Sequence, residues 1–401
     1  RADVEDVDRL LRELTRELPV ETVPLLECAG RVLAEDVSAQ VNVPGFRRAA
    51  MDGYAVRGED TFGASEYSPL VLRIVGEAYP GRPFAGSVGA GQAARIMTGS
   101  PLPEGADAVV MAEVCEERDG EVHVREAIAP KKNVGEIGED IRAGQLLLRR
   151  SRRLRPQDAG LLASIGCGAV RAIRRPRVQF VITGDELLPA GSKLDDYQIV
   201  DSNSVLLQAL VARDGGILLP FELLPDRPER IRAALETEEA DVVLVSGGSS
   251  VGQEDHAPRL VAELGSLDFH GVTMRPSSPA GGGRIGERLV FLLPGNPVSC
   301  LCAYEFFAGP SLRALGGRSR EWPHRRVSLP LARKISSQIG RTDYVRVAIE
   351  DGHVVPIATS GASILSSTVR AAGAVIVPRA LEGMPEGAEV EVLLYDEEPA
   401  A

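Results

Sequence analysis

Strand-like and helix-like segments alternate along residues 176–315, and this rhythm constrains the fold of the 401-residue chain more than any other feature. The strand-like runs are 177–182, 217–224, 241–245 and 289–293. One of the intervening helices opens near residue 201, and its spacing is expected to bury Val205, Leu206, Ala209 and Leu210. Such alternation predicts a sheet with helices on both faces, that is, a three-layer α/β domain over residues 176–315.

The rest of the chain lacks this alternation and is richer in short β-like runs. An amphipathic helix over about residues 4–18 is followed by short strands up to about residue 150, which indicates a mixed N-terminal domain with a β-rich insertion. After residue 316, apolar residues alternate up to an Asp351-Gly352 turn, which indicates a β-barrel or sandwich. We therefore predict a multidomain α/β chain. Its domains are a mixed α/β domain at 1–43 and 136–175, a β-rich inserted domain at 44–135, the α/β domain at 176–315 and a C-terminal β-barrel at 325–396.

The composition argues against several classes of protein. Acidic residues outnumber basic ones by 57 to 45, and the net charge of −12 disfavours nucleic-acid binding, which depends on Lys and Arg at phosphates. No apolar run approaches the roughly 18 residues of a membrane span, so no membrane association is expected. The five cysteines lack paired spacing, which disfavours a disulfide framework or a zinc site and fits a cytoplasmic location. Cys300 and Cys302 are expected to be buried and inert.

Four loops follow the expected strands of the α/β domain, and ligands of such sheets bind at the carboxyl ends of the strands. The loops are 183–186, 224–226, 246–255 and 293–299. The third is rich in Gly and Ser, whose free N–H groups suit a phosphate. Glu186, Asp226 and Asp255 add carboxylates, and together these groups suit a phosphate ester or anhydride bridged by Mg²⁺. Taken singly, each loop is equally well explained as a tight turn or a helix cap.

Loops in the N-terminal half complete a resemblance to a known family. The chain carries AMDGYAV at 50–56, RIMTGSPLPEGADAVV at 95–110 and GEDIRAG at 138–144. The α/β domain adds TGDEL, a DSN helix start, SGGSSVG and LPGNPVS. With these motifs the sequence resembles, over essentially its whole length, the molybdopterin molybdotransferase family, which includes the carboxyl-terminal region of gephyrin.

The resemblance implies an enzyme of molybdenum cofactor biosynthesis. Such an enzyme inserts molybdate into adenylated molybdopterin and releases AMP, with Mg²⁺ present, and the α/β domain would bind the molybdopterin. The resemblance also implies a homodimer with its active site in a cleft between subunits, and a transient contact with the molybdopterin adenylyltransferase. Two alternatives stay open, a catalytically weak molybdopterin-binding paralogue and a dimeric scaffold.

The resemblance carries site residues over by matching motif. The expected catalytic residues are Asp52, Thr98, Asp140, Glu186, Asp226 and Asp255, and the last two are the expected Mg²⁺ ligands. The expected substrate-binding residues of the strand-end loops and of the DSN helix start are Gly184, Asp185, Ser202, Asn203, Ser246, Gly247, Gly248, Ser250, Pro294, Gly295, Asn296, Pro297 and Ser299. They are completed by Arg275, Pro279, Arg346 and Ser367, of which the resemblance assigns the two arginines and Ser367 to the molybdate.

One motif departs from the family pattern. Where the family carries Lys-Pro-Gly-Lys-Pro, this chain has RPSSP at 275–279, so the first cation becomes a guanidinium and the second is lost at Ser278. Losing one charge-assisted hydrogen bond is expected to weaken molybdate binding by roughly 10- to 150-fold. The loss would be smaller if Arg284 or Arg288 reached the same anion.

Overall fold

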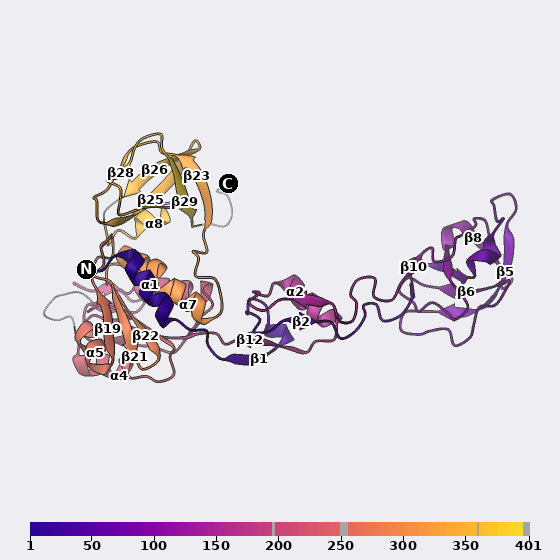
Figure 1. Cartoon of the computed structure of the whole chain (residues 1–401), viewed down its shortest axis with the longest axis horizontal. Coiled ribbons are helices and arrows are strands. Elements are labelled where there is room, and N and C mark those ends of the chain that lie inside the picture. Colours follow the sequence, from indigo (N-terminus) through magenta and orange to yellow (C-terminus); the bar gives the residue numbers. More distant parts are fainter. Residues whose placement is uncertain (195–196, 249–255, 359–360, 396–401) are drawn as a thin grey trace. The chain divides into compact units, whose positions relative to one another are not determined.

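The computed structural model describes the whole chain except residues 195–196, 249–255, 359–360 and 396–401. The chain divides into two compact units (Figure 1). Unit 1 comprises residues 1–21, 30–32 and 171–401, and unit 2 comprises residues 22–29 and 33–170. None of the described helices is long and apolar enough to cross a membrane.

A seven-stranded sheet forms the centre of unit 1 in the part of the chain that the structure describes. Its order is β16 (Ile217–Leu218), β13 (Arg177–Thr183), β18 (Val242–Ser246), β22 (Arg288–Leu293), β21 (Gly281–Ile285) and β19 (Ser266–His270), with β17 (Leu223–Leu224) also paired to β13. Pairing is parallel from β16 to β22 and antiparallel at β21 and β19. The single strand expected at 217–224 is two short strands, because Pro220 between them has no N–H to donate to a ladder.

Helices pack on both faces of this sheet, because successive residues of a strand point to opposite sides. Phe180 and Ile182 of β13 belong to a core shared with α1 (Val4–Leu14), α3 (Asn203–Arg213), α6 (Pro297–Ala303) and α7 (Gly309–Leu315). Val181 belongs to a second core, shared with α4 (Pro228–Leu235) and α5 (Ala257–Leu264). The carboxyl ends of the parallel strands are therefore left as the open edge of the sheet.

The buried face of α3 agrees only in part with the expected one. Leu207, Leu210 and Val211 are buried, whereas Val205 and Ala209 are exposed. The expectation is confirmed for Leu210 and in part for Leu206, which packs against the core. It is wrong for Val205 and Ala209, which face the solvent. Helix α1 is also shorter than expected and ends at Leu14, before the Pro19 that was expected to stop it.

A second sheet in unit 1 lies in the C-terminal part of the chain. Its order is β20 (Met274–Arg275), β25 (Thr342–Glu350), β27 (Gly373–Val377), β29 (Glu389–Leu394) and β23 (Arg325–Pro330), with β26 (His353–Ala358) paired to β25. Asp351 and Gly352 form the expected turn, with φ of 47° and 74°, the left-handed values that a two-residue hairpin loop needs. A bridge between Leu331 and Val354 links the end of β23 to β26. The short pair β24 (Ile335–Ser336) and β28 (Gly383–Met384) and the helix α8 (Ser366–Val369) accompany this sheet.

A six-stranded sheet organises unit 2. Its order is β7 (Ala108–Met111), β4 (Gly53–Val56), β6 (Gln92–Ile96), β5 (Leu70–Ala78), β9 (Glu121–Val124) and β8 (Cys115–Arg118). Helix α2 (Pro156–Ser164) follows an arginine-rich segment in which Arg152 and Arg155 both bind Asp158. The remaining short strands of the chain are β1 (Val20–Pro24), β2 (Val37–Ser38), β3 (Arg48–Ala49), β10 (Val134–Gly135), β11 (Leu146–Leu148), β12 (Ala169–Ile173), β14 (Leu187–Leu188) and β15 (Ile199–Val200).

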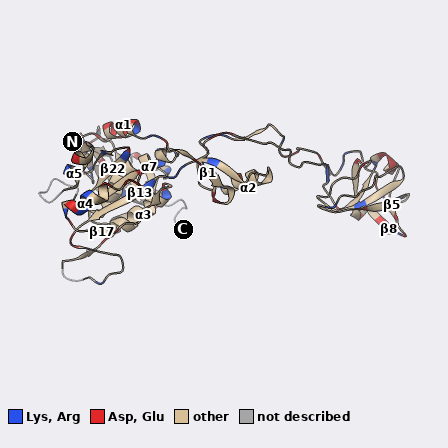
Figure 2. Ribbon diagram, turned by 90° about the horizontal axis from the view of Figure 1, so that it is seen from below, with Lys and Arg blue, Asp and Glu red and all other residues tan. Residues whose placement is uncertain are grey.

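Acidic and basic residues are interspersed along the ribbon (Figure 2), and Glu305 is a buried carboxylate among them. Glu305 lies on a π-helical turn, Tyr304–Ala308, between α6 and α7. Its carboxylate accepts hydrogen bonds of 2.6 and 3.0 Å from Arg213 of α3, and it lies 3.3 Å from the His324 ring. Burial alone would raise the pKa of Glu305, but the hydrogen bonds from His324 and Arg213 hold it at about 2. The ionised pair joins α3 to the segment between α6 and α7.

Replacing Glu305 with Gln is expected to destabilise unit 1 by about 1–3 kcal/mol, because Arg213 and His324 lose a buried charged acceptor and Arg213 keeps only Asp214. Urea unfolding followed by a probe in unit 1 would measure this loss. The control is Glu391→Gln, whose partner Arg326 is on the surface, and it should change stability by less than about 1 kcal/mol. Equal losses in the two variants would contradict the prediction.

Candidate functional site

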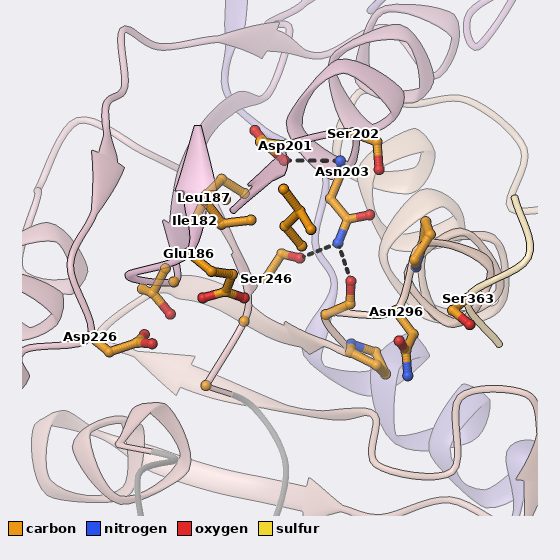
Figure 3. A pocket seen from close by; sticks show the side chains of 18 of the residues that line it. Ile182, Glu186, Leu187, Asp201, Ser202, Asn203, Asp226, Ser246, Asn296 and Ser363 are labelled. Atoms are coloured by element: carbon orange, nitrogen blue, oxygen red, sulfur yellow. Dashed lines mark hydrogen bonds between the residues drawn. The ribbon is translucent and has the colours of Figure 1, made fainter. Parts of the chain in front are cut away.

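A pocket of about 590 Å³ opens at the carboxyl edge of the central sheet of unit 1 (Figure 3). Its walls come from the segments that follow β13, β17, β18 and β22, and from the start of α3. Of the expected catalytic residues, Glu186 and Asp226 line it. Of the expected substrate-binding residues, it is lined by Gly184, Ser202, Asn203, Ser246, Gly247, Gly248, Pro279, Pro294, Gly295, Asn296 and Pro297. The strand-end loops thus share one pocket.

The buried side chain of Asn203 holds three walls of this pocket together. Its Nδ2 donates to Ser246 Oγ at 2.9 Å and to the Gly295 carbonyl at 2.7 Å (Figure 3). Asp201 Oδ1 in turn accepts from the backbone N–H groups of Asn203 and Ser204, at 3.0 and 3.1 Å. These bonds fix the start of α3 against the end of β18 and against the turn after β22.

Glycine at position 247 is required by a close backbone approach. Its φ is 94°, in the left-handed region, and a Cβ there would lie 2.1 Å from the carbonyl oxygen of Thr183. The segment after β18 can therefore follow the end of β13 only without a side chain at this position. Gly247 and Gly248 both line the pocket.

Three buried polar atoms of the pocket have no hydrogen-bond partner within the described residues. They are Thr183 Oγ1, Asn203 Oδ1 and Asp226 Oδ1. Buried polar atoms in proteins are nearly always hydrogen-bonded, so such a group of unpaired atoms around one cavity indicates where a polar ligand or water binds. In Figure 3, Glu186 and Asp226 lie on one side of the pocket, and Asn296 and Ser363 lie on the other.

Asp226 lines the pocket on the segment after β17. Asp185 Oδ1 accepts the backbone N–H of Asp226 at 3.2 Å, so Asp185 positions the segment after β17. Among the residues that the structure describes, no group of three His, Cys, Asp or Glu side chains is gathered for a metal. Asp255, an expected Mg²⁺ ligand, and Ser250 lie outside the described residues. Mg²⁺ is commonly held by one or two carboxylates and completed by substrate phosphate and water, so Asp226 with its unpaired oxygen fits that role.

The RPSSP segment at 275–279 lies between the pocket and the C-terminal sheet. Pro279 lines the pocket, and the Ser277 hydroxyl donates to the carbonyl of Ser299, which is buried on α6. Ser277 has φ of 82°, a left-handed value that suits the glycine of the family pattern better than serine. Arg275 does not line the pocket and is bound to Asp343.

The two other expected molybdate residues are buried. Arg346 on β25 is 1% exposed. Ser367 on α8 is also 1% exposed and donates to the Ile364 carbonyl at 2.6 Å. Neither residue lines the pocket at the sheet edge.

The remaining expected catalytic residues belong to unit 2. Thr98 donates its backbone N–H and its hydroxyl to Asp52 Oδ1, each at 2.7 Å, and these bonds lower the pKa of the Asp52 carboxyl. The AMDGYAV and RIMTGSP loops therefore meet at a defined ionised carboxylate. Asp140 is exposed on its own turn. Thr98 also lines a separate cavity of about 480 Å³ in this unit.

The lining residues of the sheet-edge pocket that sequence reasoning missed include Asp201 and Ser363. Asp201 was seen only as a helix start, although the first residue of DSN is itself the buried acceptor that orders the segment. No sequence pattern indicated Ser363, because a contact between distant segments brings it to the pocket: the N–H of Val298 donates to the carbonyl of Ala362 at 2.9 Å.

Cys300 and Cys302 are buried as expected. Burial raises the pKa of both thiols, that of Cys300 to about 12.

Known proteins match this chain along nearly its whole length. Three family models match: "MoeA N-terminal region (domain I and II)" over residues 2–166, "Probable molybdopterin binding domain" over 179–314 and "MoeA C-terminal region (domain IV)" over 328–395. Molybdopterin molybdenumtransferase 2 of Mycobacterium tuberculosis is 33% identical, over 97% of this chain and 98% of its own. Molybdopterin molybdenumtransferase of Haemophilus influenzae is 34% identical, over 84% and 83%. A solved structure of a molybdopterin biosynthesis MoeA protein from Pyrococcus horikosii is 35% identical, covers 99% of this chain and 100% of its own, and has a TM-score of 0.83.

Replacing Asn203 with Ala is expected to destabilise unit 1 by about 1–3 kcal/mol, because the Gly295 carbonyl and the Ser246 hydroxyl each lose a buried partner. Thermal unfolding of unit 1 measures the effect. The control is Gln208→Ala, an exposed change on the same helix, which should stay within about 0.5 kcal/mol of the parent. A parent-like unfolding midpoint in Asn203→Ala would show that the amide does not hold the pocket.

Proposed function

The chain belongs to the molybdopterin molybdenumtransferase family, and on this basis we propose that it places molybdate on the dithiolene sulfurs of adenylated molybdopterin and releases AMP. The observation that carries the proposal is the pocket at the sheet edge, where three unpaired buried polar atoms and the carboxylates of Glu186, Asp201 and Asp226 surround a cavity of about 590 Å³. Such a cavity is in the size range of small-molecule sites. Because the relatives are named as transferases, this function is favoured over a non-catalytic binding protein or a scaffold.

Within this proposal, the residues of the chain bind and orient the substrate. The N–H groups of the 246–248 segment suit the phosphates, since the backbone there carries no side chain at Gly247 and Gly248. The Ser202 hydroxyl makes no capping hydrogen bond in α3, so it is available as a donor at the pocket wall. The unpaired Asn203 Oδ1 is an acceptor for a ligand N–H.

We propose Mg²⁺ as the cofactor, with Asp226 as one ligand and Asp255 as a second. The support is the unpaired, buried Oδ1 of Asp226 beside the pocket that the phosphates would occupy. Bound there, Mg²⁺ would neutralise the charge of the phosphoanhydride oxygens. Glu186, on the wall next to Asp226, adds a carboxylate that can accept a hydrogen bond from a metal-bound water.

The finer details of fold and location are likewise proposals. We infer three layers for the α/β domain from its two cores, and a barrel for the C-terminal sheet from the bridge that links β23 to β26. The domain boundaries given by the sequence stay a prediction. A cytoplasmic location and a transient contact with the molybdopterin adenylyltransferase follow from the substrate, which that enzyme would supply in adenylated form.

AMP release from adenylated molybdopterin is expected to require both molybdate and Mg²⁺. Asp226→Asn should lower the rate by roughly 100-fold or more, because a metal at this position stabilises developing charge by several kcal/mol. The control Glu222→Gln changes an exposed glutamate on the same segment and should leave the rate within about twofold of the parent. Undiminished AMP release from Asp226→Asn, or from chelator-treated parent, would contradict the role of Asp226. A parent that releases no AMP would contradict the function itself.

We also propose a homodimer in which Asp52 and Thr98 of one subunit act with Asp226 of the other. The motive is that the expected catalytic residues are divided between the two compact units of the chain. Mixing inactive Asp52→Ala and Asp226→Ala subunits should restore about a quarter of the parent rate, since half of the dimers are mixed and each has one intact site. Mixtures that stay inactive while sedimentation shows mixed dimers would refute the shared site.

A further inference from the structure

The lost cation at position 278 raises the question of which residue now supplies the charge. The two candidates from the sequence are engaged elsewhere: Arg288 donates to the carbonyls of Leu235 and Thr237, and Arg284 lies 3.7 Å from Asp268. Both are on β21–β22, at the antiparallel side of the central sheet. Neither therefore replaces the missing lysine.

A different arginine lies beside Arg275. The parallel pairing of β20 with β25 sets Arg275 opposite Asp343, and Arg341 is two residues earlier on the same segment as Asp343. Asp343 is fully buried and accepts hydrogen bonds from Arg275 Nη2, from Arg341 Nε at 2.7 Å and Nη2 at 3.3 Å, and from the Ser337 hydroxyl at 2.9 Å. One carboxylate thus holds two guanidinium groups in a fixed arrangement.

The charges of Arg275, Arg341 and Asp343 do not cancel. Two guanidinium groups and one carboxylate leave one net positive charge, and the two arginine side chains are 31% and 26% exposed while Asp343 is not exposed at all. The negative charge is therefore hidden behind the positive ones. Asp343 accepts hydrogen bonds from Nη2 of Arg275 and from Nε and Nη2 of Arg341. The Nη1 group of each guanidinium therefore does not take part in the contact with Asp343. Among the described residues, Arg341 Nη1 contacts the side chain of Gln338, at 3.3 Å.

Two buried donors of the neighbouring loop point to an acceptor that is absent from the described chain. Arg275 Nε and Ser278 Oγ are buried and have no hydrogen-bond partner among the residues that the structure describes. Both belong to the RPSSP segment, whose Pro279 lines the pocket. Unpaired donors beside a net positive pair of arginines suit an oxyanion.

We propose that Arg341 is a further oxyanion-binding residue, which supplies the second positive charge that the family pattern places at position 278. Asp343 is the positioning residue that sets the Arg341 and Arg275 guanidinium groups side by side. The inference rests on the proposed function, in which molybdate is a substrate. It replaces the expectation from the sequence that this chain binds molybdate weakly for want of a second cation.

Molybdate binding to the full chain, measured by titration calorimetry without the pterin, tests the proposal. Arg341→Gln should raise the molybdate Kd by roughly tenfold or more, the effect of one charge-assisted hydrogen bond. Arg341→Lys keeps the charge but loses the forked contact with Asp343, so its Kd should lie between those of Arg341→Gln and the parent. The matched control Arg333→Gln removes an exposed arginine of the same sheet region and should leave the Kd unchanged. An unchanged molybdate Kd in Arg341→Gln, with or without a lower unfolding temperature, would contradict the proposal. It would show that Arg341 neutralises the charge of Asp343 and does not bind the anion.

Replacing Ser278 gives a second test, which does not alter the contacts of the buried Asp343 carboxylate. Ser278→Lys in the parent should change the Kd by less than about threefold, whereas in the Arg341→Gln background it should restore roughly tenfold. A tenfold gain from Ser278→Lys in the parent would overturn the proposal, since the second cation would then be missing as the sequence suggested. A parent that binds molybdate but releases no AMP would count against the proposed function and leave the assignment of Arg341 standing.

Discussion

The site depends on the in-register parallel pairing of three buried strands. Ile182 of β13 is paired with Ser246 of β18, and Ser246 is paired with Leu293 of β22. The three strands therefore end at one level, and the segments that leave them begin side by side. Because parallel strands share their direction, every such segment emerges at the same edge of the sheet. A slip of two residues in either ladder would carry one wall of the pocket away from the others.

This edge becomes a pocket through a few small or polar groups rather than through apolar packing. Gly247 allows the backbone after β18 to approach Thr183, and the Asn203 amide uses both of its hydrogens to hold Ser246 and Gly295. An amide suits this position because it carries two donors and one acceptor on a short side chain. The acceptor stays unpaired within the described chain, so the same residue that builds the wall also presents a polar atom for a ligand.

Two buried carboxylates of the chain are each shared by a pair of arginines. Arg152 and Arg155 share Asp158, and Arg275 and Arg341 share Asp343. The basic residues of the sequence are nearly all Arg, with Lys only at 131, 132, 193 and 334. The planar guanidinium can engage a carboxylate along one edge and keep further donors free, which an ammonium cannot do with the same geometry. An arginine at position 275 therefore needs a carboxylate to orient it, and Asp343 meets that need.

The sequence by itself determined the parts of the molecule that depend on local pattern. Strand and helix periodicity located the α/β segment and helix α4 with its bounds, because both follow from side-chain spacing. The Asp351-Gly352 turn and the four strand-end loops follow from the conformations that Gly and Pro allow. It also identified Glu186 and Asp226 as residues of one pocket, since both follow parallel strands. The tertiary structure alone decided that Leu207 rather than Ala209 of α3 is buried, that Ser363 reaches the pocket, and that Arg341 lies beside Arg275. Each of these depends on a contact between segments far apart in the chain, through Asn203, Val298 or Asp343, and no local pattern encodes such a contact.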